Sequence, residues 1–322
     1  MALTPAQLVA RTGRIGGSDA AAVCGQPAHN TAYEVALRIR GELPPNTALD
    51  DKDFILFGDE MEGVLARVYE KKHPGVVLEI PDTVVHPKHP FIAANIDRRV
   101  KGNPKLALEM KNTGLHVQDT WGRALTDEVP TRVLMQVQHC MMVCPEIEDF
   151  AVIRCYGGNT FLEYTVPRHP GLIESIEQIE VEFWENLQKG ILPEPDWEHG
   201  STKGTMKRAF QKIQGVIEAR EDLIHWTRCW EEATAARLQA EKLEVALKNR
   251  IVQMMGNTEI ALLPDGTKWV RKLVTRKGFV VEPSSYIETR RIKPRGKKGA
   301  QADESDGNSI ALTDQRQGGN AE

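Results

Sequence analysis

Residues 91–111 read FIAANIDRRVKGNPKLALEMK. Two apolar runs, at 91–96 and 106–110, lie on either side of the Gly-Asn-Pro sequence at 102–104. Short apolar runs separated by such residues are typical of two strands joined by a turn. The pattern therefore predicts a β-hairpin over this stretch.

Three ionisable residues of this stretch are expected to meet at one site. Asp97 follows the first run, and Glu109 and Lys111 lie two residues apart at the end of the second. Because side chains alternate across a strand, Glu109 and Lys111 face one way and Met110 faces the other. Two carboxylates and a lysine suit a divalent metal ion and the chemistry of phosphate esters. An ordinary surface hairpin would explain the same spacing.

The composition excludes several classes of protein. The 322 residues are 41% hydrophobic and 27% charged, which is ordinary for a globular protein, and they allow one large domain or two smaller ones. The formal net charge of -4 excludes a uniformly basic nucleic-acid binder, so DNA contact requires a local basic patch. No apolar run approaches the roughly 20 residues of a membrane-spanning helix. The first residues lack a secretion signal, so we expect a cytoplasmic protein and no membrane contact.

The periodicity of apolar residues predicts helices and strands in a mixed order up to residue 195. Helices are expected after Ser18 and at 32–40, 58–69, 129–143 and 171–188, and further strands at 76–80, 83–86, 150–155 and 161–166. This order predicts an α/β fold in which helices flank a mixed central β-sheet. Residues 1–195 are thus expected to form the main domain.

The remainder of the chain has a different pattern. Residues 203–255 are charge-rich and helical, which predicts a helical hairpin or short coiled coil. A Pro-Asp-Gly turn at 264–266 predicts a β-hairpin whose basic and aromatic residues suit nucleic acid, although a strand edge protected by lysines explains the charges equally well. We therefore expect an accessory region at 201–293 and a disordered tail at 294–322.

Polar residues on the predicted helices could complete the site. Glu62 flanks an apolar stripe, although the helix dipole also explains a glutamate early in a helix. Gln136 and Gln138 lie in an apolar helix and need hydrogen-bond partners if they are buried. Ser18, with Arg11 nearby, would form either an anion site at a helix N-terminus or a plain N-cap.

Taken in order, these residues resemble five motifs of the phage lambda exonuclease and YqaJ-type viral recombinase family, which has the PD-(D/E)XK, restriction-endonuclease-like fold. The resemblance covers residues 11–190. The matching stretches are Arg11 to Ser18 (Arg-x-Gly-x-Ile-x-x-Ser), Gly58 to Glu62 (Gly-x-x-x-Glu), Asn95 to Asp97 (Ser-Pro-Asp), Leu108 to Lys111 (Leu-Glu-x-Lys) and Gln136 to Gln138 (Gln-Val-Gln).

The chain departs from the family pattern at four positions. Asn95 takes the place of a phosphate-binding serine, and Ile96-Asp97-Arg98 takes the place of Pro-Asp-Gly. Val133 stands where the family often has an aromatic residue. These departures affect the expected substrate contacts more than the expected metal site.

The resemblance implies a Mg²⁺-dependent exonuclease, with two ions and with Mn²⁺ able to substitute. It would digest linear double-stranded DNA from 5′ to 3′ and leave 3′ single strands for recombination by strand annealing. The implied catalytic residues are Glu62, Asp97, Glu109, Lys111 and Gln136. The implied metal ligands are Asp97, Glu109, the Met110 carbonyl and Glu62, and the implied 5′-phosphate or DNA contacts are Arg11, Ser18, Asn95 and Gln138.

By analogy the resemblance also implies a homo-oligomer in the form of a trimeric ring, a single-strand annealing protein as partner, and a phage or prophage origin. Two other functions compete with this one. One is a non-catalytic protein that binds DNA ends or loads a recombinase. The other is a DNA endonuclease with the same core.

Overall fold

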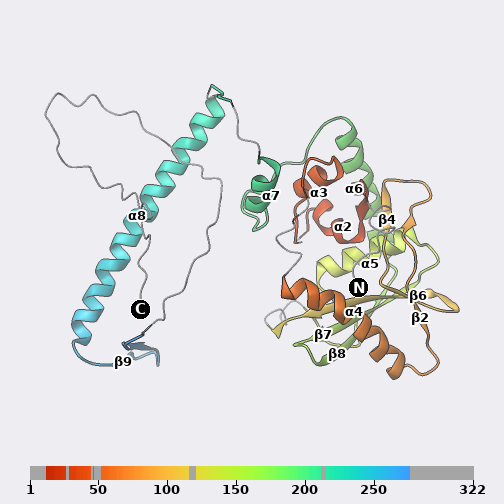
Figure 1. Ribbon diagram of the computed structural model, residues 1–322, viewed down its shortest axis with the longest axis horizontal. Helices are drawn as coiled ribbons and strands as arrows, with labels where there is room; N and C mark the ends of the chain where they lie inside the picture. Colours follow the sequence, from red (N-terminus) through yellow and green to blue (C-terminus); the bar gives the residue numbers. More distant parts are fainter. Residues whose placement is uncertain are drawn as a thin grey trace, which may run out of the picture. The chain divides into compact units, whose positions relative to one another are not determined.

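The computed structural model describes residues 12–26, 29–44, 46, 52–115, 121–211, 215–218 and 220–275. The chain divides into two compact units, Met1–Leu247 and Lys248–Glu322. The secondary structure of the first unit surrounds a β-sheet (Figure 1). None of the helices in the described ranges has an apolar stretch long enough to cross a membrane.

A five-stranded mixed sheet forms the centre of the first unit. Its strands, in spatial order, are β2 (Leu78–Glu79), β5 (Arg98–Val100), β6 (Asn103–Thr113), β7 (Asp149–Tyr156) and β8 (Thr160–Pro167). Strands β6 and β7 run parallel, whereas the other neighbours run antiparallel. A parallel pair needs a crossover connection, and helix α5 (Thr131–Val143) lies in that connection. The predicted mixed central sheet is therefore confirmed.

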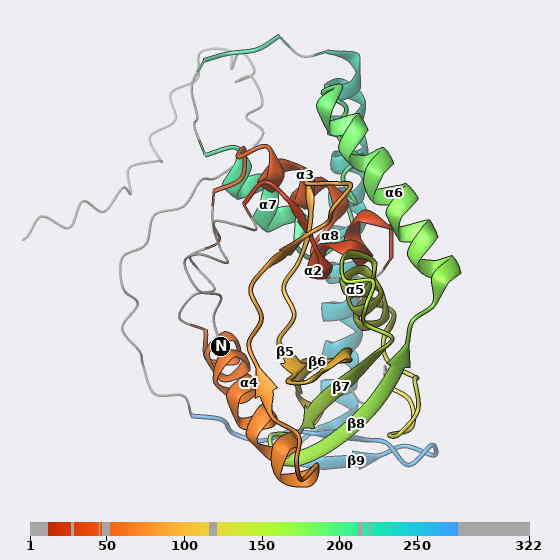
Figure 2. The ribbon, with the colours of Figure 1, turned by 90° about the vertical axis from the view of Figure 1, so that its right-hand side faces the viewer.

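Helices cover both faces of this sheet, because its strands are apolar on both sides. On one face α4 (Asp53–Lys72) packs Leu65 and Tyr69 among residues that include Leu108 and Met110 of β6. In the view of Figure 2, strands β5 and β6 lie between α4 and α5. The expected flanking by helices is therefore confirmed, and the two faces of β6 have separate environments.

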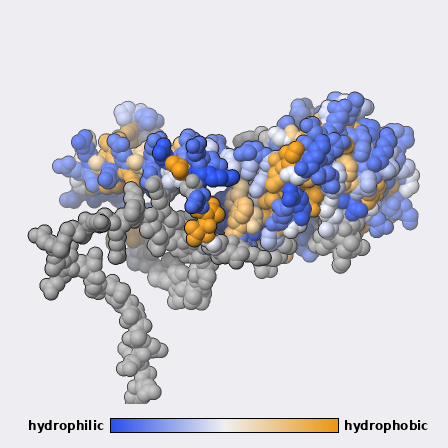
Figure 3. Space-filling model, turned by 90° about the horizontal axis from the view of Figure 1, so that it is seen from above, coloured by the Kyte–Doolittle hydropathy of each residue, from blue (hydrophilic) through white to orange (hydrophobic). Residues whose placement is uncertain are grey.

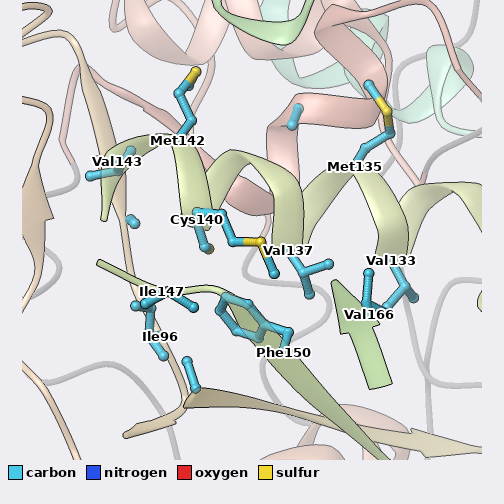
Figure 4. Close-up of a cluster of buried hydrophobic side chains, with 14 of the residues drawn as sticks. Ile96, Val133, Met135, Val137, Cys140, Met142, Val143, Ile147, Phe150 and Val166 are labelled. Atoms are coloured by element: carbon cyan, nitrogen blue, oxygen red, sulfur yellow. The ribbon is translucent and has the colours of Figure 1, made fainter. Parts of the chain in front are cut away.

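Helix α5 covers the second face and is itself buried on two sides. Figure 4 shows Val137 directed toward Phe150 of β7, while Met135 and Met142 point away from the sheet. Beyond α5 lie α2 (Gly17–Val23), α3 (Ala32–Ile39) and α6 (Pro170–Gln188). Helices α2 and α6 both contact α5 and each other. Helix α5 is thus held between the sheet and a further layer of helices.

The hairpin predicted over residues 91–111 is wrong in its first strand, which belongs to a second, three-stranded sheet. Its strands are β1 (Ile15–Gly16), β4 (Ile92–Ala94) and β3 (Val84–Val85), with β4 in the middle. The first apolar run of the hairpin therefore belongs to a different sheet from the second. The actual hairpin joins β5 to β6 across Lys101 and Gly102, where Gly102 has a φ of +81°. Asp97 consequently lies in the connection between two sheets.

The part of the chain after residue 195 differs from expectation in two ways. Helix α7 (Thr202–Ala209) packs on α3, where Arg208 binds Glu34 at 2.5 Å, so the division of the structure does not coincide with the expected boundary. Helix α8 (Glu221–Met255) is one continuous helix of 35 residues, and the predicted helical hairpin is wrong. No Gly or Pro interrupts residues 221–255, so nothing in this segment favours a turn.

The second unit confirms the predicted β-hairpin. Strands β9 (Ile260–Leu262) and β10 (Lys268–Val270) pair antiparallel on either side of the turn at 264–266. The predicted disordered tail, 294–322, lies outside the described residues.

Apolar residues that remain on the surface, such as Trp226 and Trp230 of α8, are interspersed with charged ones. The face in Figure 3 accordingly shows small hydrophobic patches on a mainly hydrophilic surface.

Candidate metal centre

The alternation of side chains along β6 places the predicted residues as expected. Met110 is buried among the residues that pack under α4, whereas Glu109 and Lys111 face α5. The Lys111 Nζ atom lies 2.6 Å from Glu109 Oε1 and 3.0 Å from Gln136 Oε1. Gln136 Nε2 donates a hydrogen bond of 2.7 Å to Glu109 Oε1. The three side chains therefore close a triangle in which each contact joins a donor to an acceptor.

Asp97 reaches the same strand from the connection between the sheets. Its Oδ2 atom accepts a hydrogen bond of 2.7 Å from the backbone N–H of Met110. Met110 lies between Glu109 and Lys111 in the chain, so this bond fixes Asp97 beside both. The electrostatic effect of Lys111 on Asp97 agrees with that placement, because it opposes the rise in the Asp97 pKa that burial causes.

The carboxylates of this centre concentrate negative charge in a poorly solvated place. Glu109 is 2% exposed, and burial, together with the charges of Asp97 and Glu62, raises its pKa to about 7. Burial and the charge of Asp97 also raise the pKa of Glu62. Burial alone would lower the pKa of Lys111, but the carboxylates of Glu109 and Asp97 outweigh it and raise that pKa. Lys111 is therefore a cation at neutral pH.

One unpaired atom makes this centre suitable for a cation. Glu109 Oε2 is buried and accepts no hydrogen bond from the residues that the structure describes. A buried oxygen without a partner is unfavourable, and a divalent cation would satisfy it and relieve the repulsion among the carboxylates. The residues in the described ranges contain no set of three His, Cys, Asp or Glu side chains already placed to hold a metal ion. Asp97 and Glu109 fit the predicted ion, and Glu62 acts on both through its charge.

The predicted phosphate-binding residues do not all reach this centre. Arg11 lies outside the described residues. Ser18 is exposed on α2, but the N-cap of that helix is Gly16, whose N–H donates to Asp19 Oδ2 at 3.0 Å. The alternative interpretation of Ser18 as an N-cap is therefore wrong. Asn95 accepts a hydrogen bond of 2.5 Å from Thr83 through its side-chain oxygen.

Gln138 has a structural position, and its predicted DNA contact is wrong. The residue is fully buried, with 0% exposure. Its Nε2 atom donates to the Pro167 carbonyl at 2.7 Å, and its Oε1 atom accepts from the His169 N–H at 2.9 Å. Both ends of the amide are therefore occupied by backbone atoms at the junction of β8 and α6.

Two basic residues near the centre escaped the sequence analysis. The charges of Arg132 and Lys111 both lower the pKa of His29, after burial, which has the largest effect. Arg132 has no ion-pair partner within the described ranges, and burial lowers its pKa. It precedes Gln136 by four residues on α5, so helical periodicity places both on one side of the helix. That spacing would have identified Arg132, whereas no local signal marks His29.

Comparison with known proteins shows what this part of the chain resembles. Residues 8–146 match the model of the YqaJ-like viral recombinase domain. The chain is 29% identical over 253 residues to the "Uncharacterized protein YqaJ" of Bacillus subtilis (strain 168), which covers 76% of this chain and 77% of that protein.

Solved structures that resemble the chain include two exonucleases. The alkaline exonuclease LHK-Exo from Laribacter hongkongensis is 19% identical, with a TM-score of 0.46 over 58% of this chain and 94% of its own. A phage related exonuclease from Haemophilus somnus 129PT is 12% identical, with a TM-score of 0.42 over 55% of this chain and 94% of its own. The family match agrees with the resemblance drawn from the motifs, because residues 8–146 are similar to the YqaJ-like viral recombinase domain.

Proposed function

We propose that this protein is a metal-dependent deoxyribonuclease of the exonuclease type. It digests linear double-stranded DNA from 5′ to 3′ and leaves 3′ single strands for recombination by strand annealing. The observation that carries the proposal is the hydrogen-bonded triangle of Glu109, Lys111 and Gln136, with Asp97 held beside it on the Met110 N–H. Similarity to the recombinase family supports the choice of DNA as substrate.

The carboxylates are proposed to hold Mg²⁺, with Mn²⁺ as a substitute. Asp97, Glu109 and the Met110 carbonyl are the ligands of one ion, and Glu62 contributes to a second. Such ions, when bound, polarise the phosphate and promote ionisation of the attacking water. The unpaired Glu109 Oε2 supports this assignment.

Lys111 and Gln136 have distinct proposed roles. Lys111 keeps its proton at neutral pH, so it acts as a hydrogen-bond donor toward the attacking water or the developing negative charge and not as a base. Gln136 accepts a hydrogen bond from Lys111 Nζ while donating one to Glu109. Because an amide has one accepting and one donating end, this pair of bonds fixes the direction of the ammonium group.

Basic side chains around the centre are proposed to bind the DNA backbone. Arg132 supplies positive charge close to Lys111, because its charge acts on the pKa of Lys111, and both charges lower the pKa of His29. A phosphate of the DNA backbone would bind there, because its negative charge attracts basic side chains that otherwise repel one another. Ser18, with Arg11 and Asn95, is proposed to contact the terminal 5′-phosphate, as the family motifs imply.

Further proposals concern the assembly and the remainder of the chain. Resemblance to the family supports a trimeric ring, a single-strand annealing protein as partner, a phage or prophage origin and a cytoplasmic location. Lys268, Arg271 and Lys272 of the second unit lie at an exposed hairpin, which supports a role of that unit in binding DNA or the partner.

Digestion of end-labelled linear duplex DNA, with MgCl₂ or with EDTA, tests the proposal. We expect wild-type protein to release 5′ nucleotides only with Mg²⁺, and Lys111→Ala and Asp97→Ala to lose that activity. Lys105→Ala is the matched control, because Lys105 lies on the same strand but pairs at the surface with Glu148. Undiminished digestion by either centre variant would remove the proposed site.

Two substrates separate the competing functions. Covalently closed circular DNA remains intact if the enzyme needs an end, and cleavage of it would indicate an endonuclease. Binding of DNA ends without any digestion would indicate a non-catalytic protein. A 5′-hydroxyl in place of the 5′-phosphate should slow the enzyme, and equal rates would discard the role of Ser18 and Arg11.

A further inference from the structure

A buried ion pair lies one helical turn from the metal centre. His139 of α5 and Glu180 of α6 both have 0% exposure. His139 Nδ1 lies 2.7 Å from Glu180 Oε1, and His139 Nε2 lies 3.0 Å from the backbone carbonyl oxygen of Ala93. One imidazole ring therefore joins α5 to α6 and to β4.

The partners of this ring determine its charge. A carbonyl oxygen can only accept a hydrogen bond, and so can an ionised carboxylate. Paired with an ionised Glu180 carboxylate, His139 carries a proton on both ring nitrogens and is an imidazolium ion. Burial alone would lower the pKa of His139, but the charge of Glu180 outweighs it and raises that pKa. The other ionisable groups that affect His139 are Asp19, whose charge raises its pKa, and His86, whose own pKa is lowered in part by His139.

The bond from His139 to Ala93 connects the two halves of the metal centre. Along α5, His139 follows Gln136 by three residues, so both are on one side of the helix. Along the other segment, Ala93 precedes Asp97 by four residues. The bond from His139 to Ala93 thus ties the helix that carries Gln136 to the strand that leads into Asp97.

We propose that His139 is a positioning residue, which sets the distance between the Gln136–Lys111 side and the Asp97 side of the metal centre. This inference rests on the proposed nuclease function. The buried apolar residues Cys140 and Met141 of α5 belong to the same hydrophobic cluster as Ile92 of β4. Apolar contacts have no preferred direction and tolerate sliding, whereas the bonds of His139 fix one register.

The cost of burying the ion pair of His139 and Glu180 agrees with a role in fixing the geometry of neighbouring elements. Glu180 Oε2 is buried and has no hydrogen-bond partner in the described part of the chain. Replacing a buried ion pair by apolar residues of similar volume is often neutral or stabilising. The pair is therefore not needed to fill the core, and its benefit lies in the geometry that it imposes on its neighbours.

A double substitution separates positioning from general stability. His139→Leu alone leaves the Glu180 carboxylate buried without its partner, and we expect a large fall in melting temperature. His139→Leu with Glu180→Leu removes both charges and should recover most of that loss. We nevertheless expect the double variant to lose about 10–100-fold in kcat, with KM for DNA changed less than twofold, as is usual when an outer partner of a metal ligand is removed.

Met142→Leu is the matched control, because it conserves volume on the same buried helix and should leave kcat unchanged. A double variant with wild-type kcat would overturn the inference. Should the double variant fail to fold, His139→Gln gives the same test, since glutamine has one donating nitrogen in place of the two of imidazolium. In that variant, too, an unchanged kcat would overturn the inference.

Two measurements remain valid even if the protein does not cut DNA. In ¹⁵N NMR of labelled histidine, the signals lost in His139→Gln should come from a ring with both nitrogens protonated at pH 7.5. A neutral ring there would overturn the inference. Titration with Mn²⁺ should show about 10-fold or more weaker binding by the double variant than by wild type, and equal binding would overturn the inference. A wild-type protein that binds Mn²⁺ without digesting DNA would count against the proposed function alone.

Discussion

The raised pKa of Glu109 leads to a prediction about stability without metal. The carboxyl group has a pKa of about 7 in the folded protein, against an ordinary value of 4.5. Because the folded state holds this proton more tightly than the unfolded state, stability is fully present below pH 4.5 and is lost as the pH rises through 7. At about 1.4 kcal/mol per pKa unit, the loss from this group is about 3 kcal/mol.

Glu109→Gln removes the titration while keeping an acceptor for Lys111 and Gln136. In EDTA at pH 8.5 we expect this variant to be more stable than wild type by about 3 kcal/mol, or about 6–12 °C in melting temperature. At pH 4.5 the difference should vanish, because both proteins are then neutral at this position. Thermal unfolding between pH 4.5 and pH 8.5 measures the difference.

Bound metal should reverse the order of stability of wild type and Glu109→Gln. A bound cation requires the ionised carboxylate, so Mg²⁺ should stabilise wild type at pH 8 and leave Glu109→Gln nearly unaffected. The ionised fraction of Glu109 rises about tenfold between pH 6 and pH 8, and Mg²⁺ affinity should rise by about the same factor. Glu148→Gln, a change at an exposed ion pair, is the control. A difference between wild type and Glu109→Gln that stays constant across the pH range would refute the reasoning.

Further predictions concern packing and charge around the centre. Gly17→Ala places a methyl group 3.1 Å from Cys140 Sγ and 3.2 Å from the Gln136 carbonyl oxygen, so α5 must shift. We therefore expect a lower kcat and a loss of about 1–3 kcal/mol in unfolding free energy. Gly58→Ala meets nothing within 4 Å and should stabilise α4 by about 1 kcal/mol in urea unfolding, with activity unchanged. Arg132→Gln should raise KM for DNA and flatten the dependence of log Kd on log salt by about 0.9, whereas an unchanged slope would exclude a phosphate contact.

Much of the centre could be predicted from local patterns. Alternation along β6 is a property of the extended backbone, so Glu109 and Lys111 had to share a face and Met110 had to take the other. The apolar periodicity around Gln136 likewise predicted α5, and the order of the motifs predicted the family.

Other features depended on contacts between distant parts of the chain. Residues 91–96 have the composition of a hairpin strand, yet β4 pairs with β1 and β3, because register and partner depend on surfaces far away in sequence. Gln136 and Gln138 are equally polar members of one helix, but only packing against β8 and α6 shows that Gln138 is enclosed. The length of α8 also escaped prediction, since a charge-rich pattern fits one helix or two.

The sequence by itself therefore determined which side chains β6 presents together and which family the domain resembles. Only the tertiary structure decided how Asp97 reaches β6, how far Glu109 is removed from water, and that His139 connects three elements. The physical reason is that the period of a strand or helix is set by the adjacent backbone. Desolvation and hydrogen bonds between elements exist only after segments separated by tens of residues have packed together.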